Sequence, residues 1–247
     1  MEKISFLEQK AKDLRKKVLS LGLDHKEAHL GGSFSIIEIM IALYETALKD
    51  DDKFILSKGH CCYPMYILLK ERGYDPKISP HPDIDEKNKV FCTTGSLGHG
   101  LPIGVGMALA RKKLNKPGKI FVLMGDGECQ EGTTWESILI ANHHKLDNLV
   151  VIIDRNKLQA LDSTENVLSL GDLKEKFSAF GMDVTELDGH SLKELIEELS
   201  KENKGKTKVI IAHTIKGKGI SYMENDPKWH TRLPTENELK NAYDELK

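Results

Sequence analysis

The chain has 247 residues, of which 39% are hydrophobic and 30% are charged, and its formal net charge is -2. This charge balance gives no reason to expect a nucleic-acid partner, which normally requires a clustered basic face. No apolar run approaches the roughly 18 residues that cross a bilayer, and the charged, amphipathic start lacks the apolar core of a signal peptide. We therefore expect a cytoplasmic globular protein with no membrane partner.

Helical periodicity dominates the start of the chain. Apolar residues predict a helix over 7–21 and a second helix over 36–43, capped by Ser33 or Ser35. A short apolar strand is expected over 54–56, and a helix over 61–70. The proline-rich stretch 76–89 is predicted to be a loop. A glycine-rich segment, 93–106, then leads into a helix of small residues over 105–114.

Strand and helix patterns alternate in the rest of the chain. The expected segments are 120–124, 131–145, 149–153, 172–180, 182–187, 191–203 and 207–212, followed by a helical tail over 235–246. This alternation predicts an α/β fold in which a parallel sheet carries helices on both faces. No repeat or linker divides the chain, so we expect one domain over 1–247. The four cysteines form no CxxC pair, which favours reduced thiols over zinc ligands or disulfides.

The most informative residues follow two of the apolar runs. The run 120–124 leads into Gly125, Asp126 and Gly127, and the run 149–153 leads to Asn156. The ends of neighbouring parallel strands face one pocket. A carboxylate, an amide oxygen and a backbone carbonyl make a hard oxygen set for Mg²⁺, which phosphate oxygens would complete. The alternative is that Asp126 only caps the next helix. The whole pattern favours a metal site that anchors a phosphate group.

Together with Glu131-Gly132 and Asn156-Lys157, this pattern resembles the thiamine diphosphate signature of the transketolase family. Other segments resemble the family's SGHPG, S-x-GH, HP, TGPLG and final histidine motifs: Ala28-His29-Leu30-Gly31-Gly32, Ser57-Lys58-Gly59-His60, His81-Pro82, Thr94-Gly95-Ser96-Leu97-Gly98 and Trp229-His230. Ser96 replaces the family's usual proline and His99 its usual glutamine. These two departures bear on the donor and acceptor sugars rather than on cofactor binding.

The resemblance implies a thiamine diphosphate-binding fold and a set of cofactor residues. Asp126 and Asn156 would bind Mg²⁺ through their side chains and Leu158 through its backbone carbonyl, with Ca²⁺ or Mn²⁺ as substitutes. Further contacts to thiamine diphosphate would come from His60, Gly95, Ser96, Leu97, Gly125, Gly127 and His230.

The resemblance also implies catalytic residues and an activity. His29 and His230 would flank the reactive carbon of the cofactor and the sugar hydroxyls, and His81 would meet the donor. Glu131 would join a carboxylate network across a subunit contact. The implied reaction moves a two-carbon ketol unit from a ketose phosphate to an aldose. Histidines suit its proton transfers because their ordinary pKa is about 6.5.

The similarity ends where the first domain of a full-length transketolase ends. It therefore implies a split enzyme in which a separate C-terminal subunit completes each site, in an α₂β₂ assembly. Pentose-phosphate interconversion is the default role, and specialised sugar biosynthesis is the alternative that Ser96 and His99 suggest. Two other readings stay open: a subunit of a 2-oxoacid dehydrogenase or deoxyxylulose-phosphate-synthase-like enzyme, and a non-catalytic partner protein with this domain.

Overall fold

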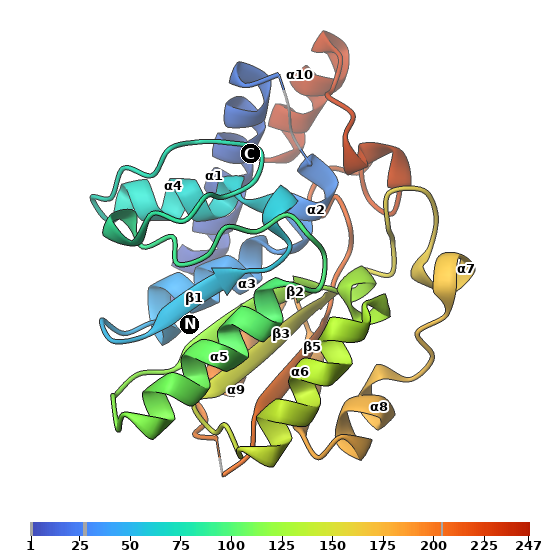
Figure 1. Cartoon of the computed structure of the whole chain (residues 1–247). Coiled ribbons are helices and arrows are strands. Elements are labelled where there is room, and N and C mark those ends of the chain that lie inside the picture. The colour runs from blue at the N-terminus through green and yellow to red at the C-terminus, as the bar shows by residue number, and fades with distance from the viewer. Residues whose placement is uncertain (1, 27–28, 204) are drawn as a thin grey trace.

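A five-stranded parallel sheet forms the centre of the molecule (Figure 1). A computed structural model describes residues 2–26, 29–203 and 205–247. The strand order is β1-β2-β3-β5-β4. The strands are β1 Lys53–Leu56, β2 Ile120–Gly125, β3 Leu149–Arg155, β4 Asp183–Asp188 and β5 Lys208–His213. The predicted α/β class and parallel sheet are confirmed.

Both faces of the sheet are buried along β1, β2, β3 and β5, whose residues are mostly apolar, whereas the edge strand β4 is largely exposed. Every residue of β3 is buried. Side chains of a strand alternate between faces, so Val150 and Ile152 enter one core while Val151 and Ile153 enter the other. Near-continuous apolar strands of this kind are typical of parallel sheets that are covered on both sides.

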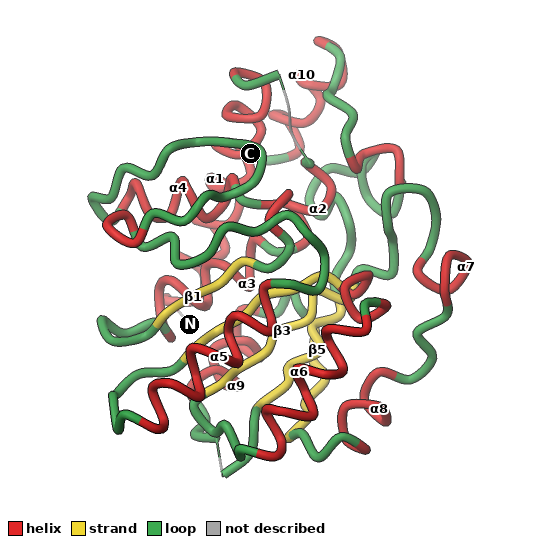
Figure 2. Tube along the Cα trace, viewed as in Figure 1, coloured by secondary structure: helices red, strands yellow, loops and turns green. Residues whose placement is uncertain are grey.

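Helices supply the other half of each core (Figures 1 and 2). One face is covered by α5 Gly100–Lys113, α6 Gly132–His143 and α8 Leu173–Ala179, and the other by α1 Glu2–Asp24, α3 Ile37–Ala42, α4 Tyr63–Glu71 and α9 Leu192–Ser200. Helix α5 lies very close to β2: a Cβ added to Gly104 would stand 2.5 Å from Val122 Cγ2. The helix predicted over 105–114 starts earlier, at Gly100, and Gly104 allows its close packing on β2.

The second predicted helix differs most from expectation. It consists of α2 Leu30–Ser35 and α3, and a π-helical turn, Leu43–Ala47, follows. The prediction that Ser33 or Ser35 caps this helix was wrong, because both serines lie inside α2. The Ser35 hydroxyl instead donates to Asp154 Oδ2 at 2.7 Å. The Ser35 hydroxyl therefore hydrogen-bonds a buried carboxylate on β3 and does not cap a helix.

The remaining elements are short or peripheral. Sequence periodicity did not predict α7 Thr164–Leu168 or the 3₁₀ turns Gly59–Cys61, Asp126–Gln130 and Pro227–His230, whereas the C-terminal helix α10 Glu236–Glu245 was expected. The loop predicted over 76–89 contains one 3₁₀ turn, Glu86–Asn88. All four cysteines are buried and form no disulfide. Over the described ranges, no helix is both long and apolar enough to cross a membrane.

Candidate active site

A cavity of about 420 Å³ opens at the carboxyl ends of the central strands. It is lined by all but one of the predicted site residues: His29, His60, His81, Gly95, Leu97, Gly125, Asp126, Gly127, Glu131, Asn156, Leu158 and His230. Ser96 is the exception; it is exposed, and its hydroxyl lies 3.3 Å from His99 Nδ1. Ala28, the first residue of one family-like motif, lies outside the described residues. The tertiary structure thus gathers motifs that are dispersed over some two hundred residues of sequence.

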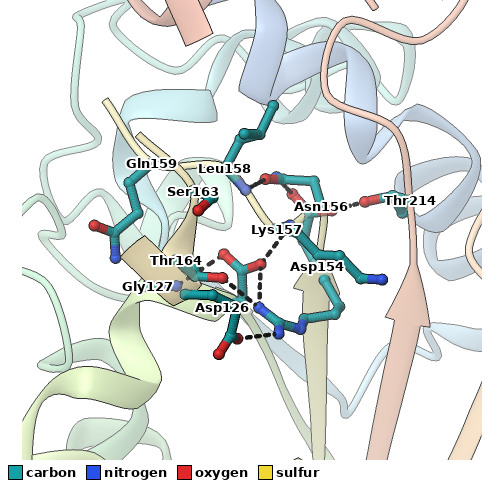
Figure 3. Close-up of polar contacts among 12 residues, drawn as sticks. Asp126, Gly127, Asp154, Asn156, Lys157, Leu158, Gln159, Ser163, Thr164 and Thr214 are labelled. Atoms are coloured by element: carbon teal, nitrogen blue, oxygen red, sulfur yellow. Dashed lines mark hydrogen bonds and ion pairs between the residues drawn. The ribbon is translucent and has the colours of Figure 1, made fainter. Parts of the chain in front are cut away.

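Asp126 stands at one end of the cavity, directly after β2, and is only 3% exposed. Its Oδ1 accepts from the Gly127 amide at 2.9 Å, and its Oδ2 accepts from the Lys157 amide at 2.7 Å and from Arg155 Nη1 at 3.2 Å (Figure 3). Helix α6 begins later, with Glu131 as its N-cap residue. Asp126 therefore does not cap α6, and the alternative reading of this aspartate is wrong.

Asn156 lies beside Asp126 because β2 and β3 are neighbours, with Gly125 paired to Asp154. The Asn156 amide group donates from Nδ2 to Asp154 Oδ2 at 2.9 Å, and Oδ1 accepts from the Leu158 amide at 3.0 Å. Asp154 also receives bonds from Ser35, Lys58 and Thr214. This fully buried carboxylate is the anchor that fixes which way the Asn156 amide faces.

The donor set at Asp126 fits a divalent cation. Burial, and then the negative charge of Asp154, raise the pKa of Asp126 to about 6. A cation bound there would hold this carboxylate in its charged form. Asp126, the Asn156 amide oxygen and the Leu158 carbonyl together offer the oxygen chemistry that Mg²⁺ prefers. Among the described residues, no group of three His, Cys, Asp or Glu side chains is arranged to hold a metal ion, so such a site would need the amide and carbonyl oxygens and the ligand's own phosphate.

The four predicted site histidines cluster together and form one wall of the cavity. The ring centre of His29 lies 5.2 Å from that of His60, 5.1 Å from that of His230 and 6.1 Å from that of His81. The rings of His60 and His230 lie 5.3 Å apart. These four residues come from segments that lie far apart in sequence, and they meet only in the folded chain.

Two lysines that sequence reasoning missed complete this wall. Lys58 is buried and pairs with Asp154, which raises its pKa although burial alone would lower it. Lys216 Nζ donates to the Gln159 carbonyl at 2.8 Å and lies 3.2 Å from His230 Nδ1. The available signal was the glycine beside each lysine, since Lys58 precedes Gly59-His60 and Lys216 opens the string Lys-Gly-Lys-Gly.

Positive charge is crowded at this wall. Burial, followed by the charges of His81 and Lys216, lowers the pKa of His29 to about 4. Burial and Lys216 lower the pKa of His230 to about 3, and burial with Lys58 lowers that of Lys216 to about 8. At neutral pH the imidazoles of His29 and His230 are therefore uncharged. An anion in the cavity would offset the remaining lysine charges.

A third missed residue, Glu128, holds the glycine-rich loop against the cavity. Its carboxylate accepts from the Gly98 amide at 2.9 Å, from the Gly125 amide at 3.0 Å and from the Ser57 hydroxyl. Gly98 has φ +75°, and a Cβ there would stand 2.6 Å from Glu131 Cβ, so this position requires glycine. One buried carboxylate thus ties together the end of β2, the turn after β1 and the loop that carries Gly95 and Leu97.

Comparison with known proteins agrees with this geometry. Residues 14–246 match the family described as "Transketolase, thiamine diphosphate binding domain". The chain is 40% identical to an apulose-4-phosphate transketolase subunit from Actinobacillus succinogenes, over 98% of this chain and 96% of that protein. It is 36% identical to the 6-deoxy-6-sulfo-D-fructose transketolase subunit SqwG of Clostridium sp. (strain MSTE9), over 88% of each. The solved transketolase from Leishmania mexicana superposes with a TM-score of 0.90 at 25% identity, covering 97% of this chain but only 41% of the longer one.

Proposed function

Because this chain belongs to the transketolase family, we propose that it is the thiamine diphosphate-binding subunit of a split transketolase. Together with a separate C-terminal subunit, it transfers a two-carbon ketol unit from a ketose phosphate to an aldose. One observation carries the proposal: a single cavity joins an oxygen ligand set at Asp126 to a wall of histidines and lysines. A diphosphate-bearing cofactor with a divalent cation matches both halves of that cavity.

In this proposal the cofactor's charged end lies between the two walls. Asp126, Asn156 and the Leu158 carbonyl would hold Mg²⁺, and Lys58 and Lys216 would offset the charge of the diphosphate. His60 and His230, which are uncharged near pH 7 because of their lowered pKa values, would contact the diphosphate as neutral imidazoles. Gly127 packs closely against the Gln159 side chain, since a Cβ there would stand 2.8 Å from Gln159 Nε2. The backbone of Gly95, Ser96 and Leu97 is assigned to the aminopyrimidine ring. Bound thiamine diphosphate supplies the electron sink for carbon–carbon bond cleavage.

The histidine wall supplies positioning and proton transfer for the sugar. His29 and His230 are neutral near pH 7 because of their lowered pKa values, so each hydrogen-bonds a sugar hydroxyl as an uncharged imidazole. Lys216 Nζ can only donate, so His230 Nδ1 is its acceptor and His230 offers the sugar an Nε2–H donor. His81 lies beside Gly95, where a Cβ would stand 3.0 Å from His81 Cδ2. This places His81 next to the loop assigned to the cofactor ring, a suitable position from which to orient the donor.

The rim of the cavity supports the need for a separate subunit. Leu97, Leu161 and Val167 line the cavity, yet 43%, 91% and 49% of each is exposed. Apolar side chains at an open rim are typical of a surface that a partner covers. The relatives from Actinobacillus and Clostridium are named as transketolase subunits, which favours a two-subunit enzyme, and we assign Glu131 to the contact. The α₂β₂ stoichiometry and a cytoplasmic location stay predictions.

The donor and acceptor stay open within sugar chemistry. The two relatives are named for apulose-4-phosphate and 6-deoxy-6-sulfo-D-fructose. We propose a ketose with a charged terminal group as the donor, in specialised sugar metabolism or pentose-phosphate interconversion. The transketolase names of these relatives favour this reaction over a 2-oxoacid dehydrogenase, a deoxyxylulose-phosphate-synthase-like enzyme or a non-catalytic partner.

The decisive experiment reconstitutes the pair. The chain and a C-terminal transketolase subunit, sought first in the adjacent reading frame, are purified separately and mixed with thiamine diphosphate and Mg²⁺. Two-carbon transfer between ketose and aldose phosphates is then measured for the separate proteins and for their mixture. We expect transfer by the mixture alone, lost on chelation of the metal and restored by Mg²⁺. Equal activity of this chain without its partner, or an inactive mixture, would contradict the proposal.

A further inference from the structure

A second cluster of buried charges lies outside the site, beside a separate cavity of about 230 Å³ that Arg15, Glu38 and His190 line. Arg15 and Glu38 form a two-pronged ion pair, Nη1 to Oε1 at 2.7 Å and Nη2 to Oε2 at 2.9 Å. Arg15 also donates to the carbonyls of Phe34 and Lys218. The pair therefore joins α1 to α3 and to the loop after β5.

His190 extends this cluster toward the site. Its Nδ1 lies 2.9 Å from Glu38 Oε2, and its Nε2 lies 2.8 Å from the backbone nitrogen of Ile215. A backbone N–H can only donate, so Nε2 is the acceptor and the ring proton is on Nδ1, where it is donated to Glu38. One imidazole thus links a carboxylate fixed by Arg15 to the main chain of the loop after β5.

That loop carries Lys216, the residue after Ile215. The Gly217 amide donates to the Gly31 carbonyl at 2.9 Å, and a Cβ on Gly31 would stand 3.1 Å from Lys216 Cγ. The space around the Lys216 side chain is therefore narrow, and a small shift of its backbone would carry Nζ away from Gln159 and His230. The bond to His190 holds the backbone immediately before this lysine.

We propose that His190 is a positioning residue, which touches no ligand but places Lys216 at the cavity wall through its bond to the Ile215 amide. Arg15 and Glu38 hold the imidazole in the required orientation and tautomer. The placement of Lys216 does not depend on the proposed function; only its use against a diphosphate does.

Two substitutions at His190 distinguish its hydrogen bond to Glu38 from its hydrogen bond to the Ile215 amide. His190→Asn keeps a donor within reach of Glu38, so the buried carboxylate stays satisfied, but its side chain is too short to accept from Ile215. His190→Gln offers both a donor and an acceptor and serves as the conservative rescue. His213→Asn is the matched control, because His213 is an exposed histidine at the end of β5 whose ring bonds Glu186.

The measurements are made on the whole chain without cofactor. Amide hydrogen exchange reports the Ile215 N–H, and NMR of ¹³C-labelled lysine reports the titration of Lys216, assigned by its loss in Lys216→Met. In the unaltered protein the pKa of Lys216 is about 8. In His190→Asn we expect exchange at Ile215 to be about tenfold faster, and the Lys216 pKa to move toward the ordinary 10.5. His190→Gln and His213→Asn keep the original behaviour.

The outcomes are distinct. A folded His190→Asn chain with unchanged Ile215 exchange and unchanged Lys216 titration overturns the proposal. An Asn variant that does not fold also overturns it, because His190 would then support the whole fold rather than one loop. Failure of the proposed function would instead appear as an inactive mixture of the two subunits, which neither measurement involves.

Discussion

Two buried carboxylates, each in contact with an arginine, behave in opposite ways in this molecule. Burial by itself would raise the pKa of Glu38, but Arg15 and His190 lower it to about 2. At Asp126, burial and the nearby Asp154 raise the pKa to about 6 despite Arg155. The Glu38 carboxylate accepts two short hydrogen bonds from the Arg15 guanidinium. The Asp126 carboxylate accepts only one hydrogen bond from the Arg155 guanidinium, at 3.2 Å.

The difference separates a cluster that holds the fold together from one that is suited to a ligand. Around Glu38, each charge has a close partner within the chain. In the cavity, the charge of Asp126 is only partly compensated by Arg155. The same cavity holds histidines and lysines whose positive charges lower one another's pKa values. A ligand that carries both a cation and an anion compensates both sides, which is how Mg²⁺ and a diphosphate would bind.

The largest expected effect tests the paired cluster. Arg15→Met leaves Glu38 buried without its main partner, so we expect the free energy of unfolding to fall by about 4 kcal/mol. Urea denaturation near neutral pH measures this change. The control is Lys247→Met, which removes an exposed pair with Asp244 and should leave stability nearly unchanged. If Arg15→Met lowers the free energy of unfolding no more than the control does, the Glu38 cluster does not stabilise the fold as we infer.

The next effect tests the metal end of the cavity. Asp126→Ala should weaken Mg²⁺-dependent thiamine diphosphate binding by about 100-fold while the chain stays folded, because this carboxylate serves the ligand rather than the core. Calorimetric titration of the reconstituted pair measures the affinity. Asp162→Ala is the control, since Asp162 is an exposed acid in the loop after β3. Unchanged affinity in the Asp126 variant would argue against the metal assignment.

The pH dependence of stability distinguishes the clusters without any ligand. His29 and His230 have folded-state pKa values below 6.5, so the unfolded chain binds more protons at these two groups and their contribution to stability falls as pH drops below about 6.5. Asp126, whose folded-state pKa is raised to about 6, contributes with the opposite sign in the same window, so the histidine contribution is isolated by comparing variants. With allowance for partial exposure, each should cost about 1 kcal/mol near pH 5. Glu38 keeps its stabilisation in this window, because that is lost only as pH falls below 4.5 toward 2.

Urea unfolding at about pH 7 and about pH 5 provides the measurement. The double variant His29→Asn, His230→Asn should lose less stability on acidification than the unaltered chain. The matched control is His143→Asn, His144→Asn, on a histidine pair at the end of α6 that lies away from the cavity. Identical acid sensitivity of the two double variants would show that the cavity histidines are not the source.

The smallest effect concerns how firmly Arg155 engages Asp126. Arg155 also donates to Thr164 at 2.7 Å and to Glu165 at 2.8 Å, so its charge is shared with α7. Glu165→Gln should let Arg155 approach Asp126 more closely and weaken cofactor binding by about threefold in calorimetry, with little change in stability. Tighter binding in this variant would mean that Arg155 supports the metal site rather than competing with it.

Much of the fold and of the candidate site could be predicted from the sequence. The apolar runs predicted the strands, and the polar residues that follow two of them predicted a common location for Asp126 and Asn156. The histidine motifs predicted residues that do meet in one cavity. These features are local: a strand's burial pattern and the turn that follows it are written in consecutive residues. The roles of the individual residues at the site remain proposals.

Only the tertiary structure decided which long-range partners each side chain has. Ser35 meets Asp154 across 119 positions, His190 meets Glu38 across 152, and Arg15 meets the Lys218 carbonyl across 203. No periodicity records such pairs, so Ser35 was assigned to a helix cap, and the roles of Lys58, Lys216 and His190 were missed. The sequence by itself determined the strands and the chemistry at their ends, because those depend on neighbouring residues. Folding determined which charges are compensated, because compensation depends on distances in space.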